Sequence, residues 1–276
     1  MRFQDYQKIH DCKPLFQTQQ SWAFLVDNKP IVCKRYPRKL DRCREEMAYY
    51  YIRDRELLRI PELYSVGEDF MEIQFIEKDR ETDVHGTIED IAKMYLATMS
   101  DSDPRGYFPK LDLSKDKLRK RIQRIPTELE RRGISEGELI GKCERFVESD
   151  YQPSSNQCLI HGDLKSPHII ESKNGRYFID LALLSVASPW YDLAVLFMEH
   201  RDRIHFLSNL SQMAYEIFGR TLGLSLEETR KKLLSGIVYR SVYDIGFAAR
   251  HRSDKSLART INDLKVILNM EEGDFR

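Results

Sequence analysis

The first third of the chain carries short apolar runs separated by turn-forming residues. Residues 22–26 form one run, and residues 31–33 form a second run that leads directly into Lys34. Asp, Asn, Lys and Pro lie between the two runs, which predicts a β-hairpin. Residues 63–69 predict a strand and turn, and residues 70–77 predict a further strand. This part of the chain is therefore expected to form a small sheet.

One helix interrupts these strands. In residues 41–58 apolar or aromatic side chains recur at helical spacing, and Met47, Tyr50 and Tyr51 are expected to share the buried face. Pro61 then ends the helical pattern, because a proline inside a helix removes a backbone hydrogen bond. The first region is thus predicted to combine a sheet with a single amphipathic helix.

Helical periods dominate the rest of the chain. Patterns of the capping-box type begin at Thr87, Ser135 and Ser225, and each precedes apolar residues at helical spacing. Residues 193–270 contain no clear strand pattern. A second, mainly helical region is therefore expected.

Residues 158–196 are the exception to this helical pattern. They predict an apolar strand, a polar turn, a short hairpin with an Asn-Gly turn, and then a helix. Asp163 follows the first apolar run and Asp180 follows the hairpin, so both carboxylates are expected at the same end of adjacent strands. An isolated Asp after a strand is often only a turn former. The two acids at this spacing favour a functional site instead.

These residues carry a resemblance to a known family. The segment HGDLKSPH (161–168), followed by FID (178–180), resembles the catalytic loop and metal-binding Asp of the protein-kinase-like phosphotransferases, particularly the aminoglycoside phosphotransferases. The resemblance implies an α+β, bilobal protein-kinase-like fold. Residues 1–77 would form the N-terminal lobe, a small antiparallel sheet with one helix, and residues 78–276 a larger, mainly helical lobe with the catalytic loop and acceptor site.

The same resemblance implies roles for four charged residues. Asp163 would orient the acceptor hydroxyl and accept its proton, and Asp180 would bind Mg²⁺ on the phosphates of ATP. Lys34, at the end of its strand, would contact the α- and β-phosphates, although a lysine at that place often only extends into solvent. Glu45 would hold Lys34, with Glu46 as the alternative partner about 100° round the helix.

Two further residues of the loop bear on the chemistry. Lys165 resembles the lysine of the protein-kinase loop and could neutralise the γ-phosphate. His168 replaces the metal-binding Asn of the family, and an imidazole is a poorer ligand for Mg²⁺ than an amide oxygen. Its role is left open between completing the metal shell and a hydrogen bond to Asp163. The Asp-x4-His spacing is similar to that of lipopolysaccharide core (Kdo/heptose) kinases.

Nucleotide contacts from the first lobe are expected from the resemblance as well. The turn before residue 22 lacks the glycines of a protein-kinase phosphate loop, and Ser21 is the candidate for a phosphate contact there. The backbone around Gln74 and Ile76 would hydrogen-bond adenine.

The amino-acid composition limits the classes of binding partner and the cellular compartment that we expect. The 276 residues include 44 basic and 44 acidic side chains, so no overall field recruits nucleic acid or membrane. No apolar run approaches the ~20 residues of a membrane span, and the polar N-terminal residues do not resemble a secretory signal. The five cysteines show no metal-site spacing. We therefore expect a cytoplasmic protein with reduced thiols and no nucleic-acid partner.

Basic residues gather in residues 114–132. They read either as the solvated face of a charged helix or as a docking surface for an anionic acceptor, such as a phosphorylated sugar or a glycolipid headgroup at a membrane surface. A second basic cluster contains Arg240, Arg250, His251 and Arg252.

Three functions remain in view. The favoured one is an ATP- and Mg²⁺-dependent kinase for a hydroxyl of a small molecule or a sugar, including a lipopolysaccharide core sugar. The alternatives are a kinase-like nucleotide-binding or scaffold protein without transfer activity, suggested by His168, and a protein Ser/Thr kinase. The last is disfavoured because Asp180-Leu181-Ala182 lacks the glycine of the usual metal-binding triplet. The pattern does not distinguish ATP from GTP or set an oligomeric state.

Overall fold

The computed structural model describes residues 1–17, 22–27, 29–99, 104–199, 203–251 and 254–269. The chain forms two compact units: unit 1 contains residues 1–97 and 161–184, and unit 2 contains residues 98–160 and 185–276. The segment with the HGD and FID motifs thus belongs to the same unit as the N-terminal residues. The predicted lobe boundary between residues 77 and 78 stays a prediction.

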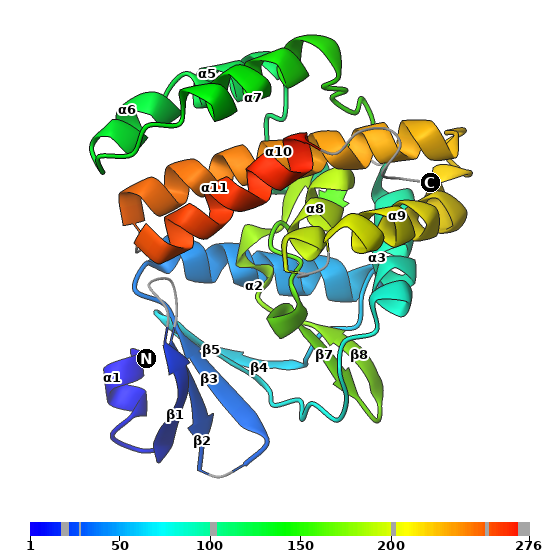
Figure 1. Ribbon diagram of the computed structural model, residues 1–276. Coiled ribbons are helices and arrows are strands. Elements are labelled where there is room, and N and C mark those ends of the chain that lie inside the picture. The colour runs from blue at the N-terminus through cyan, green and yellow to red at the C-terminus, as the bar shows by residue number, and fades with distance from the viewer. Residues whose placement is uncertain (18–21, 28, 100–103, 200–202, 252–253, 270–276) are drawn as a thin grey trace. The chain divides into compact units, whose positions relative to one another are not determined.

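Unit 1 is built on a five-stranded antiparallel sheet with the strand order β1-β2-β3-β5-β4 (Figure 1). Its strands are β1 (Cys12–Gln17), β2 (Trp22–Val26), β3 (Ile31–Arg35), β4 (Leu63–Val66) and β5 (Phe70–Gln74). The predicted hairpin is confirmed, because β2 and β3 pair directly. The last strand ends at Gln74, three residues earlier than predicted.

The short helix α1 (Phe3–Tyr6) covers part of this sheet. Phe3 and Tyr6 pack with Val26, Cys33 and Phe70 in a buried apolar cluster. Burial of such side chains contributes about 1.5–3 kcal/mol each, so the cluster fixes the strand that carries Lys34.

Helix α2 (Lys39–Asp54) packs against β5 and the 3-10 turn η2 (Leu181–Leu183). The predicted apolar face is wrong at Tyr50, whose surface is 40% exposed, whereas Tyr49 is 2% exposed. Residues 45, 49 and 52 lie on one face because they follow the i, i+4, i+7 spacing of a helix. That face buries Glu45 together with its aromatic and aliphatic neighbours.

Helix α3 (Val84–Met99) begins three residues before the predicted start at Thr87. The Asp83 carboxylate accepts a hydrogen bond from the Gly86 N–H at 3.3 Å, and the Thr87 hydroxyl donates to the Asp83 carbonyl at 2.7 Å. Asp83 therefore takes the capping role that the pattern assigned to Thr87.

The motif segment forms the turn η1 (Ser166–His168) and the antiparallel hairpin of β7 (Ile169–Ser172) and β8 (Gly175–Phe178). Gly175 has φ +117° at the end of the predicted Asn-Gly turn, a conformation that favours glycine. The predicted hairpin is therefore confirmed.

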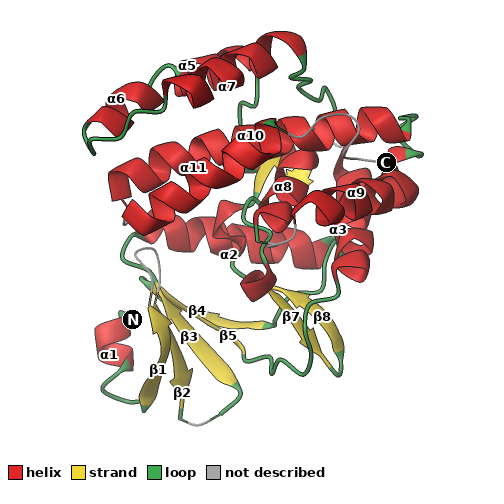
Figure 2. Cartoon of the chain, in the orientation of Figure 1, coloured by secondary structure: helices red, strands yellow, loops and turns green. Residues whose placement is uncertain are grey.

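Unit 2 is helical apart from one two-stranded antiparallel ladder, within the residues described for it (Figure 2). The ladder joins β6 (Cys158–Ile160) and β9 (Ser185–Ala187). The helices are α4 (Pro104–Tyr107), α5 (Lys115–Ile122), α6 (Ile125–Glu130), α7 (Gly137–Ser149), α8 (Trp190–Met198), α9 (Arg203–Ala214), the π-helix η3 (Tyr215–Gly219), α10 (Leu226–His251) and α11 (Asp254–Leu268). None of the described residues after 193 lies in a strand, as predicted.

The two remaining capping boxes have different outcomes. At the start of α10 the Ser225 hydroxyl accepts from the Glu228 N–H at 3.1 Å, and the Glu228 carboxylate accepts from the Ser225 N–H at 2.7 Å, which confirms that box. Glu136 instead precedes α7, and no side chain caps that helix, so the box predicted at Ser135 is wrong. No helix in the described part of the chain is long and apolar enough to cross a membrane.

Candidate active site

A buried ion pair links β3 to α2 within unit 1. The Lys34 ammonium lies 2.9 and 2.7 Å from the two carboxylate oxygens of Glu45, and the two residues are 5% and 1% exposed. The Tyr36 hydroxyl donates to Glu45 Oε2 at 2.9 Å. Tyr36 follows Lys34 by two positions, directly after the end of β3, and its hydroxyl reaches the same carboxylate.

Glu46 points elsewhere and binds Arg42 at 2.6 Å. The structure therefore gives Lys34 the predicted partner, Glu45. Burial alone would lower the pKa of Lys34, but the carboxylates of Glu45 and Asp180 raise it above its ordinary value. Burial raises the pKa of Glu45 despite the attraction of Lys34. Because its pKa is raised, the ammonium of Lys34 is charged at neutral pH.

Asp180, which follows strand β8, also contacts the ammonium of Lys34. Its Oδ1 lies 2.7 Å from Lys34 Nζ, and its backbone has φ +61° and ψ +56°, in the left-handed region that Asp tolerates better than most residues. Burial would raise the pKa of Asp180, but the attraction of Lys34 and His168 lowers it well below its usual value. Asp180 is therefore a carboxylate at neutral pH.

The loop before Asp163 is held by two backbone features. His161 is fully buried, and its Nε2 lies 3.0 Å from the Ile179 carbonyl oxygen, next to Asp180 in the chain. Gly162 has φ +84°, and a Cβ at this position would lie 2.2 Å from the Leu183 carbonyl oxygen. Only glycine satisfies both the backbone conformation and this close approach. The glycine of the motif thus holds the catalytic segment against the turn after Asp180.

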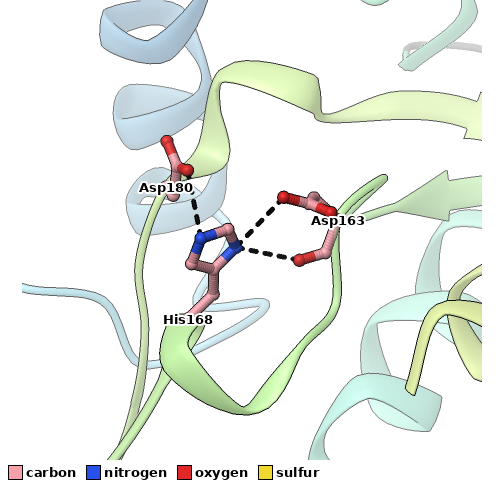
Figure 3. Close-up of side chains that lie close together, drawn as sticks. All are labelled: Asp163, His168 and Asp180. Carbon is pink, nitrogen blue, oxygen red and sulfur yellow. Dashed lines mark hydrogen bonds and ion pairs between the residues drawn. The ribbon is translucent and has the colours of Figure 1, made fainter. Parts of the chain in front are cut away.

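His168 lies between the two acids (Figure 3). Its Nδ1 is 2.9 Å from the Asp163 carbonyl oxygen and 3.5 Å from Asp163 Oδ2, and its Nε2 is 3.2 Å from Asp180 Oδ2. A carbonyl oxygen only accepts hydrogen bonds, so Nδ1 carries a proton. In the neutral ring the Nε2 lone pair then faces the carboxylate of Asp180.

Two lone pairs at this distance repel each other unless a cation lies between them. Burial outweighs the nearby carboxylates and lowers the pKa of His168, which opposes protonation of the ring. A metal ion between Nε2 and Asp180 would remove the repulsion as effectively as a second proton on the ring. Asp163, His168 and Asp180 each offer a ligand atom, and these atoms lie within 4.8 Å of one another. The donor set fits a divalent cation, with two oxygens and one nitrogen.

Lys165 completes the charge pattern of the loop. Its ammonium lies 2.5 Å from Asp163 Oδ2, which faces His168 as well. The Asp163 side chain is 13% exposed and that of Lys165 is 35% exposed. The structure therefore brings together Lys34, Glu45, Asp163, Lys165, His168 and Asp180.

The other sequence-predicted residues lie apart from this cluster or outside the description. The Gln74 and Phe75 N–H groups already donate to the carbonyl oxygens of Glu62 and Pro30, both at 2.8 Å. Ile76 lies outside the assigned helices and strands. Adenine contact there stays a prediction. Ser21 lies outside the described residues.

The sequence of the chain matches the model of the phosphotransferase enzyme family over residues 17–223 of 276. The chain belongs to this family. It is therefore a phosphotransferase. A search of curated proteins finds no match.

Solved structures with the same fold include an aminoglycoside phosphotransferase, a macrolide phosphotransferase and a choline kinase. An ADP-bound aminoglycoside phosphotransferase APH(2'')-Ib has a TM-score of 0.65 and 17% identity, over 99% of this chain and 98% of that chain. A type I macrolide 2'-phosphotransferase has a TM-score of 0.66 and 13% identity, over 92% and 90%. A choline kinase from Cryptosporidium parvum has a TM-score of 0.64 and 12% identity, over 95% and 89%. These likenesses confirm the predicted α+β, protein-kinase-like fold of this phosphotransferase.

Proposed function

We propose that this phosphotransferase transfers the γ-phosphoryl group of ATP, in the presence of Mg²⁺, to a hydroxyl of a small molecule or a sugar. The observation that carries the proposal is one continuous chain of contacts, Lys34 to Asp180 to His168 to Asp163. It joins an ammonium, a carboxylate suited to a metal and a second carboxylate within one compact unit. Phosphoryl transfer needs this combination of positive charge and positioning.

Asp163 is the proposed base. Its Oδ2 contacts Lys165, and His168 binds its backbone carbonyl, so both the side chain and the loop are held in place. A fixed carboxylate can orient the acceptor hydroxyl and take its proton as the phosphoryl group moves. Lys165 is positioned to neutralise the transferred group, and its partial exposure lets it approach a ligand.

Lys34 is the proposed phosphate contact. Glu45 and Tyr36 fix one side of its environment, and Asp180 lies on the other. An ammonium held in this way needs no reorganisation when the α- and β-phosphates arrive, which is the condition for effective electrostatic stabilisation. Binding of ATP would then exchange part of the contact with Asp180 for phosphate oxygens.

Asp180 and His168 are the proposed metal ligands. A bound Mg²⁺ would supply positive charge to the β- and γ-phosphate oxygens. Asp180 offers the oxygen that Mg²⁺ prefers, and His168 offers Nε2 because its Nδ1 proton is engaged by Asp163. In this proposal His168 would act both as a metal ligand and as a hydrogen-bond partner of Asp163, the two roles that the sequence left open.

The test is an acceptor screen by ADP release with the intact protein and the variant Asp163→Asn. A library of aminoglycosides, choline analogues, sugars and lipopolysaccharide core sugars covers the proposed acceptor class. We expect Asp163→Asn to lower turnover about 10²–10⁴-fold, the usual contribution of a general base, with nucleotide affinity nearly unchanged. Asp116→Asn, at a carboxylate that is 80% exposed on α5, is the matched control.

Three outcomes decide the proposal. Acceptor-stimulated ADP release that survives in Asp163→Asn would remove Asp163 from the reaction. Nucleotide binding without ADP release from any acceptor in the library would favour the alternative of a kinase-like binding protein. Loss of turnover in Asp163→Asn, with Asp116→Asn active, supports transfer by the proposed base.

A further inference from the structure

A cavity of about 170 Å³ lies in unit 2, walled by α5, α6 and α10. Five of its lining residues are basic and one is acidic: Lys117, Lys120, Arg121, Arg124, Arg250 and Glu128. No residue of the proposed catalytic set lines this cavity. It is therefore a separate feature that the transfer reaction leaves unexplained.

The cavity holds more positive charge than its walls neutralise. Arg250 contacts Glu128, so the one carboxylate in the lining is already paired. The side chains of Lys117, Lys120 and Arg124 form no ion pair among the described residues. Like charges that line one cavity repel each other, and an anion in the cavity would relieve the repulsion.

Arg121 is held in the wall by aromatic rings. Its guanidinium lies 4.8 Å from the ring centroid of Tyr243 and 5.5 Å from that of Tyr239. Its Nε is buried and has no hydrogen-bond partner among the described residues. A guanidinium fixed by cation–π contacts keeps a planar fork of donors, the geometry that matches phosphate oxygens.

Buried apolar residues in the lining distinguish the cavity from an ordinary solvated helix face. Ile125 and Val242 line it and are both buried. Gly246 has no side chain, and a Cβ there would lie 3.0 Å from Glu128 Oε2. The lining thus combines basic side chains with buried apolar ones, a composition suited to a charged ligand with an apolar or neutral body.

We propose that this cavity binds the phosphate group of a phosphorylated ligand. A phosphomonoester carries about −1.5 to −2 charges and three acceptor oxygens, which matches several unpaired cations and an incompletely bonded guanidinium. A phosphorylated sugar and a phosphate-bearing lipid headgroup share this chemistry. The basic side chains recognise the phosphate, and the apolar lining residues Ile125 and Val242 contact the group attached to it.

The test measures binding of glucose 6-phosphate to the full-length protein by isothermal titration calorimetry, with EDTA present and nucleotide absent. The charge-removing variant is Lys117→Gln/Lys120→Gln/Arg124→Gln. We expect it to weaken binding at least about tenfold, since three charge-assisted contacts are lost. Glucose, which lacks the phosphate, should not bind. Higher NaCl should weaken binding to the wild-type protein, because salt screens partly exposed charges.

The matched control is Arg131→Gln/Arg145→Gln/Lys255→Gln, which removes three exposed charges from the same unit outside the cavity. Equal weakening in this control would show attraction by net charge alone and overturn the proposal. Thermal unfolding of both variants checks that the fold survives. The side chains changed are exposed, so we expect little loss of stability.

A second arm separates the two sources of phosphate. Co-sedimentation with vesicles of phosphatidylcholine containing one-fifth phosphatidic acid tests the lipid headgroup, with pure phosphatidylcholine vesicles as reference. Vesicle binding that the cavity variant loses and the control retains assigns a lipid source. Binding of glucose 6-phosphate alone assigns a small ligand. Failure of both probes to bind the wild-type protein overturns the proposal, whatever the result for Asp163→Asn.

Discussion

The cations of the two units differ in what neutralises them. In unit 1 the Lys34 ammonium is buried against Glu45 and Asp180, and Lys165 contacts Asp163. In the cavity of unit 2, Lys117, Lys120 and Arg124 lie exposed, and among the described residues only Arg250 of these basic side chains has a carboxylate partner. Charges that are paired inside the fold position one another before a ligand arrives. Charges left unpaired around a hollow depend on a ligand for their partner.

The largest expected difference in stability between the two units comes from removing one cation from each. Lys34→Met leaves the buried carboxylate of Glu45 without its ammonium, so the free energy of unfolding should fall by about 3–5 kcal/mol. Arg124→Met removes an exposed charge and should change it by less than about 0.5 kcal/mol. Urea titration of both variants measures the difference. Equal losses would mean that burial of the Lys34–Glu45 pair has no energetic role.

A double variant separates stability from chemistry at the same site. Glu45→Gln added to Lys34→Met removes the buried unpaired charge and should restore much of the stability. Turnover should stay about 10²-fold or more below that of the wild type, because the phosphate contact is still missing. Recovery of turnover together with stability would show that Lys34 serves the fold and not the reaction.

One glycine from each unit allows the backbone packing of the two units to be compared. Gly162 in unit 1 and Gly133 in unit 2 have φ of +84° and +69°, but only Gly162 faces a backbone atom within 4 Å of a Cβ position. Gly133→Ala should cost about 1 kcal/mol for the left-handed conformation alone. Gly162→Ala adds the clash with the Leu183 carbonyl and should cost at least about 2 kcal/mol more. Thermal unfolding measures both, and equal shifts would remove the packing role of Gly162.

The local motif was the predictable part of the site. Asp163 and Asp180 follow the predicted strands, β6 and β8, because each step of that pattern is set by neighbouring residues. The expectation that these two strands are adjacent was wrong, since β6 pairs with β9 and β8 pairs with β7 in separate sheets. Tyr36 was missed, because it lies just after the end of β3 and no motif of the sequence marks it as a partner of Glu45. The buried face of α2 was partly mispredicted at Tyr50, since three consecutive tyrosines give a periodicity argument no way to rank them.

The long-range arrangement was beyond such patterns. Residues 161–184 join the N-terminal residues in one unit, and this grouping depends on packing between segments more than a hundred residues apart. The contact of Lys34 with Asp180 is of the same kind. The family resemblance implied that Lys34 and Asp180 approach the same nucleotide, but it placed the catalytic loop in residues 78–276 and did not anticipate the grouping in one unit. No local spacing in the sequence encodes either arrangement.

His168 allows a smaller effect to be tested at the metal. His168→Asn replaces the ring with an amide, whose oxygen suits Mg²⁺, whereas an imidazole suits a later transition metal such as Co²⁺. The ratio of turnover with Co²⁺ to turnover with Mg²⁺ should fall about tenfold, a typical effect at a metal shell. His85→Asn, an exposed position on α3, is the control and should leave the ratio unchanged. An unchanged ratio in His168→Asn would exclude the ring from the metal shell.

The smallest expected difference compares one tyrosine hydroxyl from each unit. Tyr36 donates to the carboxylate of Glu45 at 2.9 Å, and Tyr239 donates to the neutral backbone carbonyl of Asp112 at 2.8 Å. Both side chains are nearly fully buried, at 2% and 3% exposure. Hydrogen bonds to charged groups contribute about 1.5–3 kcal/mol and those to neutral groups about 0.5–1.5 kcal/mol. Tyr36→Phe should therefore cost about 1 kcal/mol more stability than Tyr239→Phe in urea titration. A larger loss of stability in Tyr239→Phe would show that the hydrogen bond of Tyr36 to the charged Glu45 is not the stronger of the two.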